Sequence, residues 1–223
     1  MTNVQDVTIP IPGSAPVSGL WLAPAAARAC LVLAHGAGAG MAHRAMTATA
    51  EGLAARGIAT LRYQFPYMER GSKRPDSPPI AHAAVRAAVA EAARRGGTLP
   101  LFAGGRSFGG RMTSQAQAIS PLPGVGGLVI FAFPLHPAVK PSDTRAAHLA
   151  EVAVPMLFLQ GTNDALAVMD LLRPVVAGLG SRATLTLAEG ADHSFHVPAK
   201  SGRKDTEVLA EMLDAAAAWM TTR

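Results

Sequence analysis

The chain has 223 residues, of which 49% are hydrophobic and 16% charged, and its formal net charge is +5. This composition excludes an intrinsically disordered chain and supplies the apolar residues of a sizeable core. Aromatic residues make up only 5%, which excludes the stacking platforms that bind single-stranded nucleic acid. The length is that of one domain, residues 1–223.

The positive charge by itself points toward nucleic acid or another anionic surface. The arginines are scattered, however, and no run of five or more lysines and arginines occurs. This distribution favours a solvated surface. We therefore expect no nucleic-acid partner.

Three features concern the compartment. Cys30 is the only cysteine, so no internal disulfide can form, and its apolar neighbours indicate a small core residue. Residues 1–12 lack the basic and apolar regions of a signal peptide, and no long apolar stretch free of Gly and Pro predicts a membrane span. These features fit a cytoplasmic protein with no membrane partner and leave the oligomeric state open.

The apolar pattern predicts a hairpin and then strands that alternate with helices. The hairpin comprises Val7–Ile11 and Val17–Leu22, separated by Pro12-Gly13-Ser14. The later predicted elements are, in chain order, strand Ala29–Ala34, helix Met41–Arg56, strand Ile58–Phe65, loop Tyr67–Pro79, helix Ile80–Arg95, strand Leu99–Ala103, helix Met112–Ile119, strands Leu128–Phe133 and Val154–Gln160, helix Ala167–Leu179, strand Ala183–Ala188 and helix Thr206–Met220. This alternation predicts an α/β fold with a mostly parallel sheet and helices on both faces.

One short motif stands between a predicted strand and a predicted helix. Gly105-Arg106-Ser107-Phe108-Gly109 has the pattern G-x-S-x-G, which is weak alone because Gly and Ser are common. Its context is more specific, since a sharp strand-to-helix turn holds a serine hydroxyl clear of its neighbours. The motif therefore predicts that Ser107 is a nucleophile.

Two further polar residues follow predicted strands. Asp164 comes after the strand Val154–Gln160, and His193 comes after the last strand. Ligands of such sheets bind beyond the carboxyl ends of the strands, and Ser…Asp…His is the chain order of G-x-S-x-G hydrolases. We predict that Ser107 attacks, His193 takes its proton and Asp164 orients the imidazole.

Each of these residues also has a structural interpretation when it is taken alone. Ser107 fits a turn, Asp164 fits a helix N-cap and His193 fits a loop. Asp192 is interpreted as a turn former rather than a catalytic acid. The coincidence of three suitable residue types at three strand ends favours the triad.

An oxyanion hole requires two N–H donors. The backbone N–H of Phe108 is one candidate, because it follows the nucleophile at the start of a helix. The other is the backbone N–H of Ala37, in the glycine-rich loop after the strand Ala29–Ala34.

That glycine-rich loop differs from a dinucleotide fingerprint. Met41 stands where the third glycine belongs, and no acid follows the next strand. We therefore predict no nucleotide site and interpret His35 as a residue that braces the loop by hydrogen bonds. No metal-ligand pattern occurs either, so we expect no metal and no cofactor.

Four stretches carry a family resemblance: His35-Gly36-Ala37-Gly38, Gly104 to Arg111, Gly161-Thr162-Asn163-Asp164 and Asp192-His193-Ser194-Phe195. Over nearly the whole chain, the sequence resembles the α/β-hydrolase superfamily and, within it, the compact dienelactone-hydrolase-like group. Residues 62–69 and 195–198 are similar to a subgroup that includes a subunit of the NSL histone-acetyltransferase complex and testis-expressed relatives.

The resemblance implies the same triad and the same oxyanion donors, Ala37 and Phe108. Dienelactone hydrolases proper have a cysteine nucleophile where this chain has Ser107, so their substrate is not implied. The activity implied is hydrolysis of carboxylic esters or thioesters. Two alternatives remain, namely a non-catalytic interaction module, since some relatives look like interaction domains, and an amidase or peptidase.

The length of one connection bears on the shape of the site. Phe133 to Val154 is too short for a cap domain, so we expect an open, shallow site. Arg70, Lys73 and Arg74 follow the second parallel strand, and Lys200, Arg203 and Lys204 follow His193. These cations are either a basic rim that attracts anionic esters or solvated loop charges.

Overall fold

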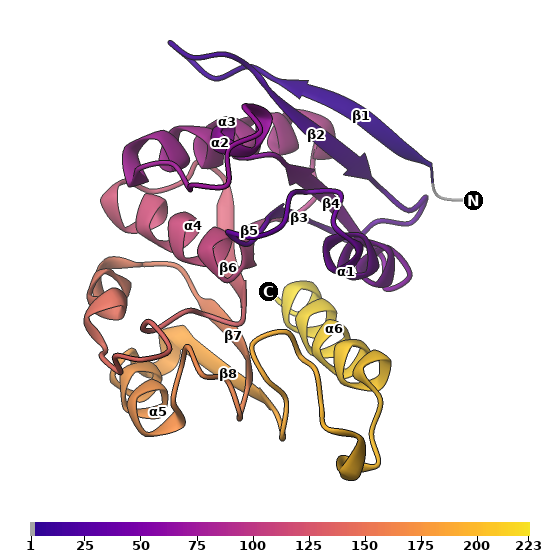
Figure 1. The fold of residues 1–223 in the computed structure, drawn as a ribbon. Coiled ribbons are helices and arrows are strands. Elements are labelled where there is room, and N and C mark those ends of the chain that lie inside the picture. The colour runs from indigo at the N-terminus through magenta and orange to yellow at the C-terminus, as the bar shows by residue number, and fades with distance from the viewer. Residues whose placement is uncertain (1–2) are drawn as a thin grey trace.

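The computed structural model describes residues 3–223. Its core is an eight-stranded sheet of order β1-β2-β4-β3-β5-β6-β7-β8 (Figure 1). The strands are β1 (Val4–Ile9), β2 (Val17–Leu22), β3 (Ala29–Ala34), β4 (Ile58–Tyr63), β5 (Leu101–Arg106), β6 (Val125–Phe131), β7 (Met156–Gly161) and β8 (Ala183–Ala188). The helices are α1 (Arg44–Ala54), α2 (Pro66–Glu69), α3 (Pro78–Gly96), α4 (Phe108–Ile119), α5 (Met169–Gly178) and α6 (Asp205–Thr221), with 3₁₀ segments η1 (Thr144–Glu151), η2 (Gly180–Arg182) and η3 (Ala199–Ser201). The predicted α/β fold is confirmed.

The strand directions bring all the later strand ends to one edge. β1 and β2 form the predicted antiparallel hairpin, and β2 also pairs antiparallel with β4. Every other pairing is parallel. The carboxyl ends of β3 to β8 therefore lie at the edge that faces the viewer in Figure 1.

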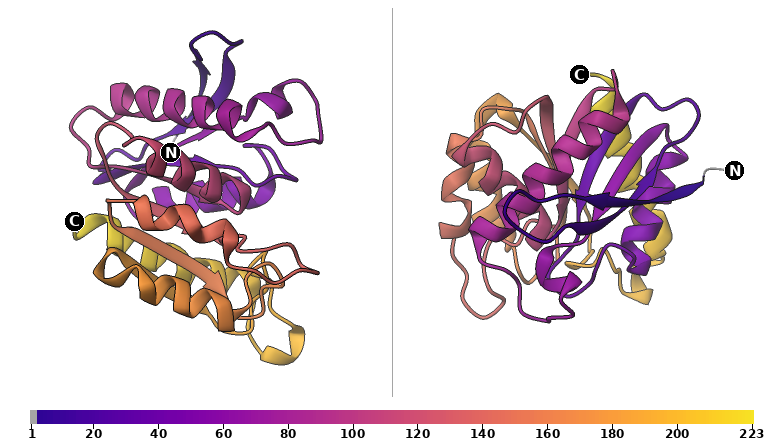
Figure 2. Two further views of the ribbon diagram at one scale, coloured as in Figure 1. Left: turned by 90° about the vertical axis from the view of Figure 1, so that its left-hand side faces the viewer. Right: turned by 90° about the horizontal axis from the view of Figure 1, so that it is seen from above.

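Side-chain alternation along the central strands explains the two helical layers. Leu31 and Leu33 of β3 pack in one apolar cluster with residues of α1 and α6. Val32 and Ala34, which point the other way, pack in a second cluster with residues of α3, α4 and α5. Figure 2 shows α3, α4, η1 and α5 side by side on that second face.

Several helix starts differ from the predictions for local physical reasons. α1 begins only at Arg44, because the His43 side chain caps it by accepting from the Ala45 N–H. α3 begins earlier, at Pro78, since a proline in the first turn has no hydrogen bond to lose. The loop predicted over 67–79 also contains most of the one-turn helix α2.

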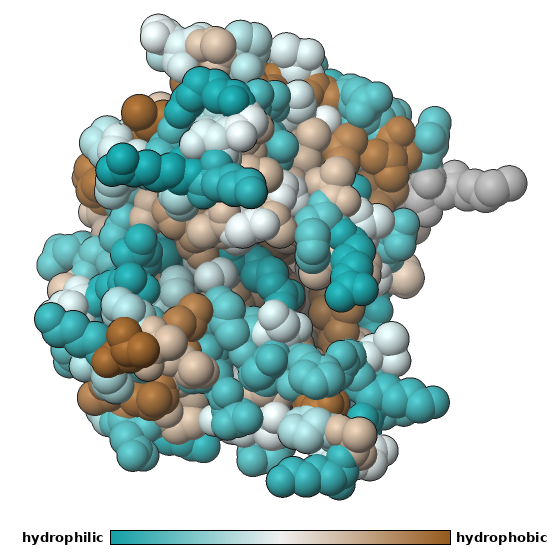
Figure 3. Space-filling view, in the orientation of Figure 1, coloured by the Kyte–Doolittle hydropathy of each residue, from teal (hydrophilic) through white to brown (hydrophobic). Residues whose placement is uncertain are grey.

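The connection from β6 to β7 contains η1 and no inserted domain. η1 packs beside α4 on the second face and does not cross the carboxyl edge (Figure 2). This connection therefore leaves the edge beside Ser107 uncapped. The face drawn in Figure 3 is hollowed near its centre, with hydrophilic side chains around the hollow.

Candidate active site

Ser107 forms a sharp turn between β5 and α4. Its backbone has φ 52° and ψ −118°, a left-handed conformation that L-residues adopt at a cost of about 1–3 kcal/mol. Flanking glycines allow the close approach that this turn requires. A Cβ on Gly105 would lie 2.4 Å from the Ala34 carbonyl oxygen, and one on Gly109 would lie 2.6 Å from the same oxygen. The turn is thus built from sequence features on both sides of the serine.

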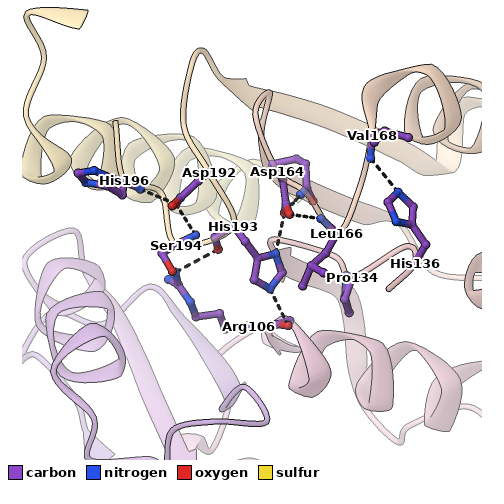
Figure 4. Close-up of polar contacts among 12 residues, drawn as sticks. Arg106, Pro134, His136, Asp164, Leu166, Val168, Asp192, His193, Ser194 and His196 are labelled. Atoms are coloured by element: carbon purple, nitrogen blue, oxygen red, sulfur yellow. Dashed lines mark hydrogen bonds and ion pairs between the residues drawn. The ribbon is translucent and has the colours of Figure 1, made fainter. Parts of the chain in front are cut away.

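The side chains of Ser107, His193 and Asp164 form one hydrogen-bonded chain (Figure 4). Ser107 Oγ lies 2.8 Å from His193 Nε2, and His193 Nδ1 lies 2.7 Å from Asp164 Oδ2. A carboxylate can only accept, so Nδ1 donates to Asp164 and neutral His193 can accept from Ser107 at Nε2. The structure therefore brings the three predicted residues together in the order that proton transfer from serine requires.

Asp164 is fully enclosed by donors. Its side chain is 0% exposed, and it accepts from the Leu166 N–H at 2.7 Å and from the Gln160 side-chain amide. α5 begins only at Met169, with Val168 as its N-cap, so the alternative interpretation of Asp164 as a helix cap is wrong. Nothing in the sequence indicated Gln160, whose amide reaches Asp164 because it lies near the carboxyl end of β7.

Asp192 has the turn-forming contacts that were predicted for it. Its Oδ1 accepts from the backbone N–H groups of Ser194 and His196, at 2.7 and 2.9 Å. These bonds shape the loop that carries His193. Asp192 therefore supports the loop, and of these two acids only Asp164 forms a hydrogen bond with the imidazole.

Arg106 is a residue of the site that the sequence did not indicate. Its guanidinium donates to the His193 carbonyl oxygen at 3.3 Å and lies 5.3 Å from the centre of the Phe195 ring (Figure 4). Phe195 itself has φ 60°. Burial lowers the pKa of Arg106, and the carboxylates of Asp192 and Asp164 act in the opposite direction. Arg106 thus joins the end of β5 to the His193 loop.

His35 braces the glycine-rich loop, as predicted. Its Nε2 accepts from the Phe65 N–H at 3.1 Å, and its Nδ1 lies 2.7 Å from the Gly36 carbonyl oxygen, to which it donates. The ring is 0% exposed, and burial lowers its pKa, which favours the neutral form that these two bonds require. Tyr67 adds a third contact by donating its hydroxyl to the Ala37 carbonyl oxygen at 2.8 Å.

The two predicted oxyanion donors belong to residues near Ser107, one in α4 and one in the loop after β3. Phe108 is the first residue of α4, where a backbone N–H has no acceptor within the helix. The loop that carries Ala37 passes next to the serine, because a Cβ on Gly36 would lie 3.8 Å from Ser107 Cβ. Whether these two N–H groups bind an oxyanion remains a prediction.

The predicted basic residues occupy loops at this edge, but two of them are bound to acids. Arg70 Nη2 lies 2.6 Å from Asp76 Oδ1, and Asp76 also accepts from the Tyr67 N–H. Arg203 Nη2 lies 2.5 Å from Glu211 Oε2. Lys73 and Arg74 are exposed. Arg70 therefore has a role in holding its own loop, which the sequence did not indicate.

A sheet of this order, with a strained serine directly after β5 and its hydrogen-bonded histidine and aspartate, defines the α/β-hydrolase class. Residues 27–221 match the alpha/beta hydrolase domain family, and the chain belongs to this family.

Solved structures of similar fold extend over the whole chain. A dienelactone hydrolase from Anabaena variabilis has a TM-score of 0.80 and 21% identity, with 99% of this chain and 98% of that chain covered. XC6422 from Xanthomonas campestris, described as an a/b serine hydrolase without lid, has a TM-score of 0.74 and 20% identity, with 97% and 95% covered. Est1E from Butyrivibrio proteoclasticus, solved with ferulic acid bound, has a TM-score of 0.76 and 14% identity, with 97% and 100% covered.

Among the helices of the described residues, none has the length and apolar character needed to cross a bilayer.

Proposed function

We propose that this protein is a serine hydrolase that cleaves carboxylic esters or thioesters through an acyl-enzyme on Ser107. The observation that carries the proposal is the chain of hydrogen bonds from Ser107 through His193 to the enclosed Asp164. A serine hydroxyl is a weak nucleophile until a base takes its proton. The imidazole of His193 is such a base, and its Nε2 lies 2.8 Å from the Ser107 hydroxyl oxygen.

In the first half-reaction, Ser107 Oγ attacks the carbonyl carbon of the substrate and His193 Nε2 takes the hydroxyl proton. Asp164 stabilises the resulting imidazolium. The N–H groups of Ala37 and Phe108 bind the oxyanion of the tetrahedral intermediate. The intermediate collapses when His193 returns the proton to the leaving oxygen or sulfur, which gives the free alcohol or thiol and acyl-Ser107.

In the second half-reaction, water attacks the acyl carbon and loses its proton to His193. The C–O bond to Ser107 then breaks, and His193 protonates the released Ser107 oxygen. The products are the free carboxylic acid and the original enzyme. Every proton in this sequence moves between substrate, water, Ser107 and His193, so the mechanism requires no metal or cofactor.

The neighbours of similar fold support the ester class, since one is named a dienelactone hydrolase and another is a ferulic acid complex. The narrower placement in the NSL-related subgroup is part of the proposal and rests on the motifs at 62–69 and 195–198. The uncapped edge beside Ser107 suits small or extended acyl groups.

A fluorophosphonate probe tests the nucleophile directly. We expect the wild type to be labelled and Ser107→Ala to be unlabelled, with Ser120→Ala, at the exposed far end of α4, as the matched control. A wild type that resists labelling would favour the interaction module. A panel of acyl p-nitrophenyl esters and the corresponding p-nitroanilides then separates esterase from amidase, and we expect turnover of the esters alone.

A further inference from the structure

Arg111, on the first turns of α4, lacks a counter-charge. Its side chain is half-buried, and its Nε is buried with no hydrogen-bond partner. Within residues 3–223, no carboxylate forms an ion pair with Arg111. The same is true of Arg145, whose charge acts on Arg111. A half-buried guanidinium without a counter-ion is costly to keep, which points to a ligand.

The groups packed around Arg111 add positive charge or none. Burial lowers the pKa of Arg111, and the nearby charge of Arg145, on η1, lowers it further. His148, also on η1, lies 2.8 Å from Ser114 Oγ of α4. Burial and the charge of Arg111 lower the pKa of His148 to about 4, so this ring is neutral at pH 7. The two guanidiniums therefore provide the charge of this cluster.

The cluster lies close to the nucleophile. The Arg111 N–H donates to the Ser107 carbonyl oxygen at 3.0 Å, so the two residues are one helical turn apart, on the same side of α4. Long helical side chains lean toward the N-terminus, and here that direction is toward Ser107. Arg145 Nη1 lies 3.5 Å from the carbonyl oxygen of Pro134, which follows the carboxyl end of β6, the strand next to β5 in the sheet.

Space for a ligand exists on the Arg145 side. A cavity of about 380 Å³ is bordered by Arg145 and Lys140, two hydroxyl groups and the apolar side chains that continue from Pro134; its lining residues are Leu135, His136, Pro137, Lys140, Ser142, Thr144 and Arg145. Lys140 is exposed and Arg145 half-buried. Cations and hydroxyls in one wall of a cavity suit an anionic group.

We propose that Arg111 and Arg145 bind a carboxylate that the substrate carries in addition to its scissile ester. The guanidinium is planar and presents paired donors that match a carboxylate, and the bound anion supplies the counter-charge that the protein does not. This assignment rests on the proposed hydrolase function and narrows its substrate class to anionic esters. It differs from a general basic rim, because it locates recognition on α4 and η1 and not on the loops of Arg70 or Arg203.

Matched pairs of alkyl esters test the assignment. Monomethyl succinate and methyl butyrate differ by a carboxylate in place of a methyl group on the acyl part, and carboxymethyl butyrate and ethyl butyrate differ in the same way on the alcohol part. With a titrimetric assay at low salt, we expect kcat/KM of the wild type to be about tenfold or more higher for the anionic member of at least one pair, as a charged hydrogen bond provides. The pair that shows the preference identifies the side on which the carboxylate lies.

Arg111→Gln and Arg145→Gln should each remove this preference, because each lowers kcat/KM for the anionic ester while the neutral partner has no carboxylate to bind. Arg173→Gln, which removes the same charge at an exposed site on α5, should retain it. Binding of succinate to the Ser107→Ala variant, measured by calorimetry, gives a readout that does not depend on turnover, and Arg111→Gln should abolish it. Neutral esters hydrolysed as well as anionic ones by the wild type, or a preference retained in Arg111→Gln, would overturn the site while leaving the hydrolase function intact.

Discussion

Replacing Arg106 by glutamine should slow the proposed hydrolysis although Arg106 does not contact Ser107 Oγ or the reacting atoms. The substitution removes the hydrogen bond to the His193 carbonyl oxygen, which at 3.3 Å is long and contributes about 1.5 kcal/mol. It also removes the cation–π contact with Phe195, which contributes about 0.5–2 kcal/mol. Together these contacts favour the ordered His193 loop by about 2–3.5 kcal/mol.

The loss should appear mainly in kcat. A loop that leaves its ordered position lengthens the contact between His193 Nε2 and Ser107 Oγ, now 2.8 Å, and proton transfer requires that contact. A destabilisation of about 2 kcal/mol, the lower end of this range, corresponds to a factor of about 30, so we expect kcat to fall about thirtyfold or more while KM changes little. The assay is steady-state hydrolysis of a neutral p-nitrophenyl ester, with Tm measured in parallel.

Arg106→Lys separates positioning of His193 from mere support of the fold. Lysine retains the positive charge without the planar fork of the guanidinium, so this variant should recover only part of kcat. A variant that loses Tm but keeps wild-type kcat would refute this reasoning.

Two further substitutions test strain and burial. Ser107→Gly should abolish labelling by the probe yet raise the free energy of unfolding by about 1 kcal/mol, because glycine accepts the φ of 52° at this position without strain. Urea denaturation measures this gain, which Ser107→Ala should not show. Equal stability of the wild type and both variants would contradict the prediction. The pKa of His148 is about 4 in the folded protein, against an ordinary value of 6.5, so between these pH values the unfolded chain binds more protons and stability falls as the pH drops. Because solvent partly screens this side chain, the loss of stability is about 1–2 kcal/mol. The Tm of His148→Gln should therefore decline less than that of the wild type from pH 6.5 to pH 4. Parallel declines of Tm in the two proteins would argue against the lowered pKa of His148.

Two strands could be predicted with their bounds because each has a local signature. β3 (Ala29–Ala34) is an apolar run buried along its whole length, and β8 (Ala183–Ala188), at the edge of the sheet, alternates threonine with apolar residues. The first turn of α4 could not be predicted, because Gly109 and Gly110 disfavour a helix in isolation. Their presence is explained only by backbone from β3 and β5, which leaves no space for a Cβ at either position.

The grouping of Ser107, His193 and Asp164 could be predicted for a related reason. Each of the three follows a strand, and parallel strands bring their carboxyl ends to one edge, so their positions after the strands were enough to group them. Gln160 and Arg106 left no comparable signal, because their partners lie on loops whose path depends on tertiary contacts. For Arg70, the ion pair with Asp76 depends on the fold of the loop between α2 and α3, which residue type and spacing do not determine.

The stretch from Gly104 to Arg111 contains two arginines that act toward different elements. Arg106 contacts the His193 loop, whereas Arg111 lies with Arg145 of η1. Free-energy effects of substitutions that share no partner add. For an anionic ester, the change in log kcat/KM from the wild type to the Arg106→Gln, Arg111→Gln double variant should therefore equal the sum of the changes in the two single variants. For a neutral ester, the double variant should match Arg106→Gln alone. Coupling between the two sites would mean that the carboxylate, once bound, also positions His193, and the division between positioning and recognition would have to be abandoned.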